Sequence, residues 1–148
     1  MLVGMTLMWS GCGSGADSGT VATLSKAAFL EKAGAICVQA DEEISRVYNR
    51  YSKKPYPGGK PPTEAVMNRV AEEVVIPARK KQVRRLRALG APPGDARRIE
   101  KMLAAIEEGI EKGERDRRTL RATGGTEYAF AKALEMEIDY GLTKCALS

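Results

Sequence analysis

The sequence predicts an all-α fold, a four-helix up-down bundle with a proline-kinked second helix, preceded by a flexible lipoprotein tether. Apolar residues recur in steps of three and four along four segments, and stretches rich in Pro and Gly separate these segments. No alternating apolar–polar pattern typical of strands competes with the helical period. The connections are short, which favours antiparallel neighbours. At 148 residues the chain fits one domain with a real core.

The N-terminal region predicts an exported, lipid-anchored protein. Residues 1–11 are uncharged and end in Ser10 and Gly11, and Cys12 and the polar stretch GSGADSGTVAT follow. This arrangement resembles a bacterial lipobox, in which the cysteine is diacylated, although Trp9 stands where Leu is usual. The run is shorter than the roughly 20 residues of a spanning helix and lacks a basic n-region. We therefore expect a truncated signal peptide (1–11), a lipidated Cys12 with its tether (12–24) and a helical domain (25–148). The alternative is a frayed apolar terminus with an unlipidated cysteine.

The first two helices follow from capping residues and proline. The first helix is expected from an N-cap at Ser25 to about Lys53, where the loop KKPYPGGKPP ends it. The second is expected from an N-cap at Thr63 to Gly90, with a kink at Pro77. The apolar stripe of the first helix comprises Phe29, Ala33, Cys37, Ala40, Ile44, Tyr48 and Tyr51.

The last two helices are delimited in the same way. Asp95 is the expected N-cap of the third helix, which the stretch ATGGT at 122–126 closes. Thr126 is the expected N-cap of the fourth. The expected buried stripes are Ile99, Leu103, Ile106 and Ile110 in the third helix, and Phe130, Leu134, Ile138, Leu142 and Cys145 in the fourth segment.

The two remaining cysteines predict a disulfide. Cys37 and Cys145 form an even pair once Cys12 carries the lipid, and each lies on an apolar stripe of a terminal helix. No CxxC spacing supports a catalytic dithiol. The alternative is two buried thiols that act as small apolar side chains.

The densest charge is a basic segment in the second helix. Its candidate contacts to an anionic lipid or another acidic envelope polymer are Arg79, Lys80, Lys81, Arg84, Arg85 and Arg87. The alternative is a solvated helix face. The net charge of +5 is mild, and aromatic residues do not alternate with the basic ones, so we expect no nucleic-acid partner. No protein partner follows from the sequence.

No catalytic, cofactor-binding or metal-binding residues are predicted, and no cofactor is expected. The chain has no histidine, the commonest general base and metal ligand. It has no nucleophile elbow, P-loop or dinucleotide fingerprint. The acidic run Asp41–Glu43 lies beside the first apolar stripe and is interpreted as a solvated face.

Five fragments in order carry a family resemblance: SGCGSG, KAGAIC, LRALGAPPGD, AAIEEGIEK and YGLTKC. Together they span nearly the whole chain, which resembles small uncharacterised lipoproteins of actinobacteria with a helical extracytoplasmic domain. The resemblance implies an envelope-anchored domain and no particular activity.

Four functions remain open from the sequence. The leading hypothesis is a non-enzymatic envelope lipoprotein that binds or scaffolds a partner outside the membrane. The alternatives are a small-ligand carrier with a cavity between its helices, a hydrolase or other enzyme, and an intracellular basic helical protein. An apolar internal pocket of roughly 300 Å³ or more would favour the carrier, and a filled core would favour the scaffold.

Overall fold

The protein is all-helical in the parts of the chain that the computed structural model describes, which are residues 23–52, 62–121 and 128–146. The elements are α1 (Lys26–Ser52), α2 (Glu64–Val70), the π-helical η1 (Ala71–Val75), α3 (Ile76–Ala88), α4 (Ala96–Arg115), the 3-10 helix η2 (Arg117–Leu120), α5 (Ala131–Tyr140) and α6 (Thr143–Ala146). The predicted all-α class is confirmed in these ranges. No strand occurs in these ranges.

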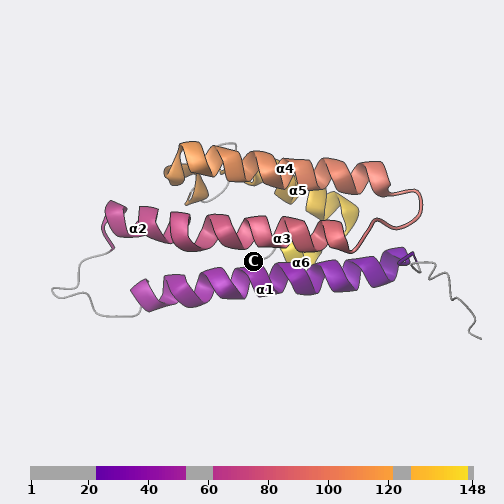
Figure 1. The fold of residues 1–148 in the computed structure, drawn as a ribbon, viewed down its shortest axis with the longest axis horizontal. Coiled ribbons are helices and arrows are strands. Elements are labelled where there is room, and N and C mark those ends of the chain that lie inside the picture. The colour runs from indigo at the N-terminus through magenta and orange to yellow at the C-terminus, as the bar shows by residue number, and fades with distance from the viewer. Residues whose placement is uncertain (1–22, 53–61, 122–127, 147–148) are drawn as a thin grey trace, which may run out of the picture.

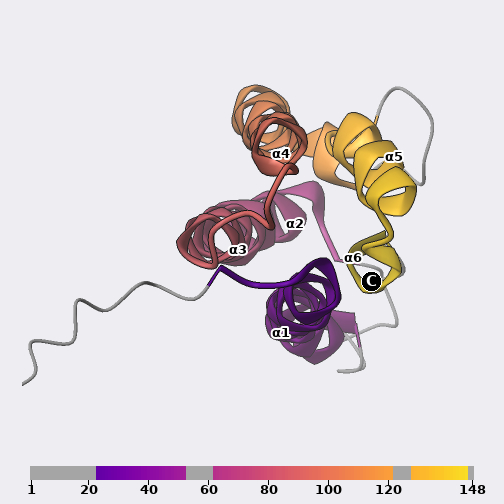
Figure 2. The ribbon, with the colours of Figure 1, turned by 90° about the vertical axis from the view of Figure 1, so that its right-hand side faces the viewer.

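The long helices stack side by side. Figure 1 shows that α1 and α4 run in one direction and that the run from α2 to α3 lies between them in the other. α3 packs against both α1 and α4, α5 packs against α4, and α6 packs against α1. Viewed end-on in Figure 2, α5 and α6 lie along one side of this stack. α6 thereby brings the end of the chain back to its first helix.

Two of the expected helix starts are built as predicted. The Ser25 hydroxyl accepts a hydrogen bond from the Ala28 amide at 3.2 Å, and the Thr63 hydroxyl accepts one from the Val66 amide at 3.3 Å. Asp95 is different. It makes no side-chain cap bond, because its carboxylate accepts a 2.6 Å hydrogen bond from the Tyr140 hydroxyl. Asp95 is therefore the N-cap residue of α4 by position, as predicted, but its side chain does not cap the helix and instead links the start of α4 to the end of α5.

The second helical run contains a π-helical turn just before Pro77. The Ile76 amide donates to the carbonyl of Ala71, five residues back, and Pro77 lies in the first turn of α3. Proline has no N–H to donate, so a wider turn at this point accommodates the missing bond. The predicted kink at Pro77 stays a prediction.

The C-terminal segment consists of two helices, α5 and the short α6, which are separated at Gly141. Gly141, with φ of 98°, ends α5, and the Leu142 amide bonds back to the carbonyl of Glu137 at 2.8 Å. α5 therefore buries Ala133, Glu137 and Tyr140, whereas Ile138 is 52% exposed. The predicted buried stripe is wrong at Ile138. The buried face of α5 includes Glu137, and a charged residue normally indicates an exposed face. The four-helix up-down arrangement stays a prediction.

The core fills the space between α1, α3, α4, α5 and α6 and extends along α4 from Ile99 to Ile110. Its fully buried large side chains are Phe29, Leu86, Met102, Leu103 and Leu142, together with Cys37. The four expected stripe residues of the third helix, Ile99, Leu103, Ile106 and Ile110, are all buried in α4. The ring of Phe29 meets that of Tyr140 edge-on at 6.0 Å, joining α1 to α5.

Candidate functional site

A pocket of about 300 Å³ opens toward the other end of the molecule, between α1 and the α2–η1 run. α1 supplies one wall with Ile44, Ser45 and Tyr48. The opposite wall is apolar and comes from α2 and η1, and the segments at 120–121 and 128–130 close the remaining side. These further lining residues are Met67, Val70, Ala71, Val75, Leu120, Arg121, Tyr128 and Phe130.

A buried ion pair, Asp41 with Arg79, also lines this pocket. A nitrogen of the Arg79 guanidinium lies 2.7 Å from Oδ1 of Asp41, and the two side chains are only 13% and 9% exposed. The guanidinium also lies 5.5 Å from the centre of the Phe130 ring, within cation–π range. The pocket therefore has largely apolar walls, a charge-balanced pair in Asp41 and Arg79, and a further charged residue, Arg121, which donates to Asn68 at 3.3 Å.

This pair corrects two sequence interpretations. Asp41 was expected on a solvated face, and Arg79 was expected among residues that contact an anionic surface. Both are instead buried against each other, because burying either charge alone would be costly. The sequence contains an indication that Asp41 is buried. It lies one turn after Cys37 and directly after Ala40, both of which are on the buried stripe.

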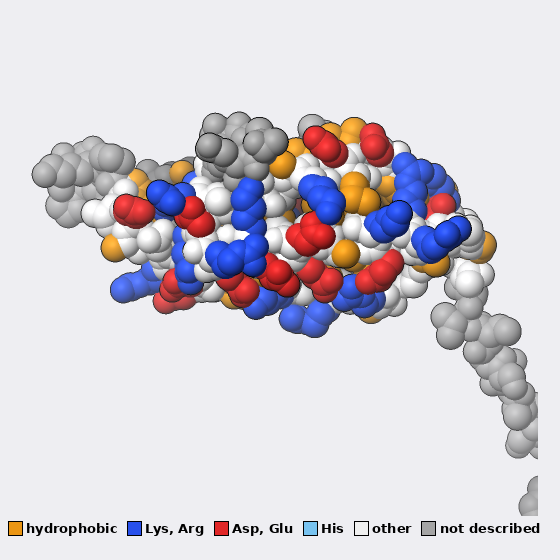
Figure 3. Space-filling model, turned by 90° about the horizontal axis from the view of Figure 1, so that it is seen from above, with side chains coloured by type: hydrophobic (Ala, Val, Ile, Leu, Met, Phe, Trp, Pro, Cys, Tyr) orange, Lys and Arg blue, Asp and Glu red, His pale blue; other side chains and the backbone are white. Residues whose placement is uncertain are grey.

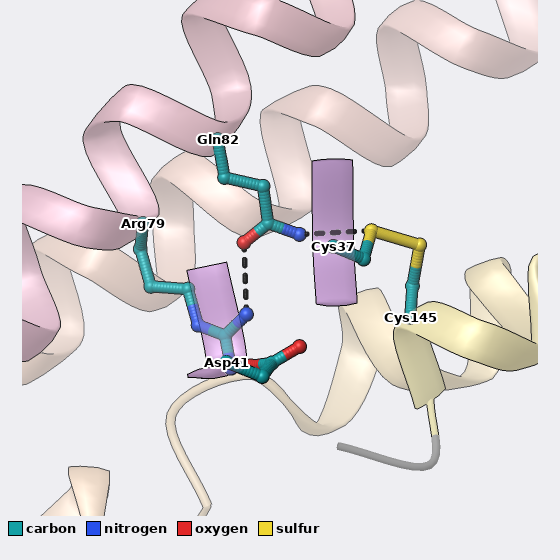
Figure 4. Close-up of a disulfide and its surroundings, with 5 residues drawn as sticks. All are labelled: Cys37, Asp41, Arg79, Gln82 and Cys145. Carbon is teal, nitrogen blue, oxygen red and sulfur yellow. Dashed lines mark hydrogen bonds and ion pairs between the residues drawn. A yellow bond between two sulfur atoms is a disulfide. The ribbon is translucent and has the colours of Figure 1, made fainter. Parts of the chain in front are cut away.

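Hydrogen bonds connect the ion pair to the disulfide region, as Figure 4 shows. Arg79 donates to Oε1 of Gln82 at 2.8 Å, and Nε2 of Gln82 donates to Sγ of Cys37 at 3.1 Å. Gln82 is 2% exposed, and both the oxygen and the nitrogen of its side-chain amide form hydrogen bonds. Sequence reasoning missed Gln82, which a helical wheel places beside the buried Val83 and Leu86.

The two predicted disulfide cysteines meet in the core. Their sulfur atoms are 2.06 Å apart and their Cα atoms 5.0 Å apart, within the roughly 4.4–6.8 Å range of disulfides. Figure 4 shows the bond joining α1 to α6. It links residues separated by 108 positions, so it fastens the end of the chain to the first helix.

Glu137 lies close to this bond in a smaller cavity of about 70 Å³, which Arg79, Gln82 and Cys145 also line. It is 6% exposed, and burial raises the pKa of its carboxyl from 4.5 to about 7. The nearby Arg79 opposes this increase in pKa and Asp41 adds to it. The carboxyl of Glu137 is consequently partly protonated at neutral pH.

Cys37, Glu137 and Cys145 also form a cluster of metal-ligand type. One ligand atom from each lies within 4.8 Å of the other two. The two sulfur atoms are bonded to each other, which leaves Glu137 as the ligand in the oxidised protein. One carboxylate does not make up a ligand set of the size that Zn²⁺ requires.

Most other side chains of the basic segment form ion pairs or hydrogen bonds with acidic or polar side chains. Lys80 pairs with Glu114 at 2.6 Å, Lys81 with Glu43 at 3.2 Å, and Arg87 with Glu100 and Glu107 at 2.8 and 3.0 Å. Arg85 donates to Gln39 at 2.6 Å. On the face seen in Figure 3, basic and acidic side chains alternate and form no single-sign patch. Contact of Arg84 and its neighbours with an anionic surface stays a prediction.

Two further findings bear on location and kinship. None of the helices in the described ranges is long and apolar enough to cross a membrane. Cys12, the predicted lipidation residue, lies outside the described residues, as do the predicted signal peptide and nearly all of the predicted tether. Comparison with models of known families, with curated proteins and with solved structures finds no match.

Proposed function

We propose that this protein is a non-enzymatic binding module of the bacterial envelope that holds a small, largely apolar ligand in the pocket beside the Asp41–Arg79 pair. The observation that carries this proposal is the pocket itself. Its volume of about 300 Å³ is at the lower end of ligand sites, which measure roughly 300–1,000 Å³. Apolar walls with few polar groups are typical of such sites.

The course of the apolar stripe along α1 supports a ligand rather than a protein scaffold. The stripe continues past the filled core to Ile44 and Tyr48, where it lines the pocket, and Tyr48 is 47% exposed. An apolar stripe normally covers a core. A bound apolar molecule would cover this remaining part.

The chemistry of the lining supports binding rather than catalysis. The pocket's charged pair, Asp41 and Arg79, is neutralised internally at 2.7 Å. Its hydroxyl groups come from Ser45, Tyr48 and Tyr128, and the chain contains no histidine that could serve as their base.

The envelope location is part of the same proposal and rests on the lipobox resemblance at Cys12. The resemblance to actinobacterial lipoproteins and the disulfide geometry both agree with export, because disulfides persist in oxidising compartments. We expect the full-length precursor, expressed in a host with lipoprotein processing, to partition into detergent and the Cys12→Ser variant to partition into water. A Cys12→Ser protein that still enters the detergent phase would contradict the anchor.

We also propose that the helices form a four-helix up-down bundle in which the axis of the α2–α3 run changes direction at Pro77. In it, α5 and α6 together act as the fourth helix and brace α1 and α4. Rigid neighbours of this kind would hold the pocket walls apart when no ligand is bound.

The binding proposal is tested with N-phenyl-1-naphthylamine, a neutral dye whose fluorescence rises in apolar surroundings. We expect saturable binding to the full chain with Cys12→Ser. Ser45→Trp should weaken binding tenfold or more, because Ser45 is an exposed residue on the pocket wall. Ala35→Trp, on an exposed position of α1 outside the pocket, is the matched control. Equal affinities of both variants, or no saturable binding at all, would overturn the proposal.

A further inference from the structure

Three metal-ligand side chains from α1, α5 and α6 converge at the disulfide, outside the large pocket. Sγ of Cys37, Sγ of Cys145 and a carboxyl oxygen of Glu137 all lie within 4.8 Å of one another. In a tetrahedral zinc site, bonds of roughly 2.0–2.3 Å place the ligand atoms roughly 3.3–3.8 Å apart. Once the two sulfur atoms are no longer bonded to each other, side-chain movements of about 1 Å would let these three groups surround one ion.

A small cavity gives this cluster access to water. Glu137 and Cys145 line the cavity of about 70 Å³, which is partly open to solvent. Both residues are 6% exposed, whereas Cys37 is fully buried. A water molecule needs roughly 10–15 Å³ of such space, so the cavity can hold one. Three protein ligands and one water molecule are the usual ligand set of a zinc site with an open position.

The hydrogen bonds around Cys37 favour a thiolate at its sulfur. Nε2 of Gln82 donates to Sγ of Cys37 at 3.1 Å, and Oε1 of the same amide accepts from Arg79 at 2.8 Å (Figure 4). The Arg79 guanidinium therefore polarises the amide whose N–H points at the sulfur. Hydrogen bonds of this kind orient the ligands of metal sites and tune their basicity.

We infer that the reduced protein binds one Zn²⁺ ion through the thiolates of Cys37 and Cys145 and the carboxylate of Glu137. A thiol reductant first opens the disulfide; it supplies two electrons and two protons and is itself oxidised to a disulfide. Each cysteine thiol then releases its proton to water as its sulfur binds the ion, and any proton on the Glu137 carboxyl leaves in the same way. This inference does not depend on the proposed function.

The types of ligand favour Zn²⁺ over other common ions. Mg²⁺ and Ca²⁺ prefer oxygen ligands alone, whereas thiolates select Zn²⁺ or Cu⁺. The carboxylate of Glu137 suits Zn²⁺ better than the softer Cu⁺. The metal and the disulfide exclude each other, because each uses both sulfur atoms, but either one joins α6 to α1.

The experiment uses Co²⁺ as a coloured substitute for Zn²⁺ on the full chain with Cys12→Ser, in which Cys37 and Cys145 are the only thiols. The protein is reduced with dithiothreitol, freed of reductant in the absence of oxygen and titrated at pH 7. We expect one Co²⁺ per chain, with the visible bands of tetrahedral cobalt and near-ultraviolet thiolate-to-cobalt bands. Zn²⁺ should displace the cobalt, and the oxidised chain should show neither set of bands.

Glu137→Gln tests the third ligand, and Glu135→Gln, at an exposed position of the same helix, is the matched control. We expect Glu137→Gln to weaken Co²⁺ binding at least tenfold, because the loss of even an outer hydrogen-bond partner costs roughly 10–100-fold in metal affinity. Glu135→Gln should bind Co²⁺ as tightly as the unaltered site. Equal affinities of Glu137→Gln and Glu135→Gln would overturn the inference.

Far-ultraviolet circular dichroism of the reduced chain, with and without Zn²⁺, covers the case in which reduction unfolds the protein. If the metal-free reduced chain is folded, Zn²⁺ should raise its midpoint of urea unfolding; if it is unfolded, Zn²⁺ should restore the helical signal. Absence of both effects, absence of the tetrahedral bands, or one ion shared between two chains would overturn the inference.

Discussion

The two halves of α1 carry one continuous apolar stripe but meet different surroundings. In the first half Phe29, Ala33 and Cys37 are fully buried. In the second half Ile44 is half-buried and Tyr48 is 47% exposed. α6 covers the first half and is bonded to it, whereas the second half faces the pocket across from α2 and η1.

This difference shows that the spacing of apolar residues identifies the helix face that is shielded from water, but not what shields it. In the first half of α1 the apolar face packs against the protein's own core, and a disulfide holds this packing in place. In the second half we propose that a ligand packs against it. We expect substitutions at the disulfide end to change stability most and substitutions at the pocket end to change binding most.

Removing the disulfide should have the largest effect on stability. The double variant Cys37→Ala/Cys145→Ala loses a bond that closes a loop of 108 residues, for which the chain-entropy model gives about 4–5 kcal/mol. Urea unfolding of the oxidised protein and of the variant measures the difference. Under conditions where the variant is still folded, dye binding should be retained. A variant as stable as the oxidised protein would show that the core alone holds α6.

The carboxyl of Glu137 should make stability fall as the pH rises through neutrality. Because its pKa is raised from 4.5 to about 7, the folded state keeps a proton that the unfolded chain loses. The stabilisation of the folded state by this proton is fully present below pH 4.5 and is lost between pH 4.5 and about 7. It amounts to at most about 3 kcal/mol. Glu137→Gln should flatten that part of the pH profile and should be the more stable protein at pH 8. An unchanged slope in the variant would refute this role.

Two glycines on one face of α4 should differ in what an added methyl group costs in stability. A Cβ on Gly109 would lie 2.5 Å from the Phe130 ring and 2.8 Å from the carbonyl oxygen of Ala129, so we expect Gly109→Ala to destabilise by about 1–3 kcal/mol. A Cβ on Gly113 would meet the flexible side chain of Leu120, so Gly113→Ala should cost less stability. Phe130 and Leu120 both line the pocket, so both variants should weaken dye binding. The reverse order of the two variants in thermal unfolding would contradict the packing described.

Loss of the Thr63 cap should be the smallest of these effects. Thr63→Ala removes the hydroxyl that accepts from the Val66 amide and should cost about 1 kcal/mol, whereas Thr63→Ser should be nearly neutral. Because α2 forms a pocket wall, the loss should appear as faster hydrogen exchange in α2 than in the first half of α1. Equal exchange in both regions of the Thr63→Ala variant would contradict a role of this cap in holding α2.

Local signals predicted much of the fold. Caps at Ser25 and Thr63 depend on nearby backbone amides alone, and the α4 stripe stands out because its apolar residues are large and evenly spaced. Asp95 is the N-cap residue of α4 as predicted, but its side chain makes no cap bond and accepts instead from Tyr140, 45 positions away. Pairings over such distances depend on the assembled fold, which local patterns do not encode.

The candidate site was less predictable than the fold. The cysteine pair followed from two apolar stripes, but Asp41, Arg79 and Glu137 are charged residues inside the protein, where charge is normally a sign of the surface. Their burial depends on partners from α1, α3 and α5 that meet only after folding. The sequence predicts the pocket only as one of several alternatives, because its walls come from separate segments of the chain.

The most direct test of the account maps where a ligand binds. Backbone amide chemical shifts of the full oxidised chain with Cys12→Ser would be recorded during titration with N-phenyl-1-naphthylamine. We predict saturable shifts concentrated at 41–48 and 67–79, with little change at 26–36 and 142–146. Saturable shifts centred on α5 and α6, or uniform shifts without saturation, would contradict a ligand pocket at the open end of α1.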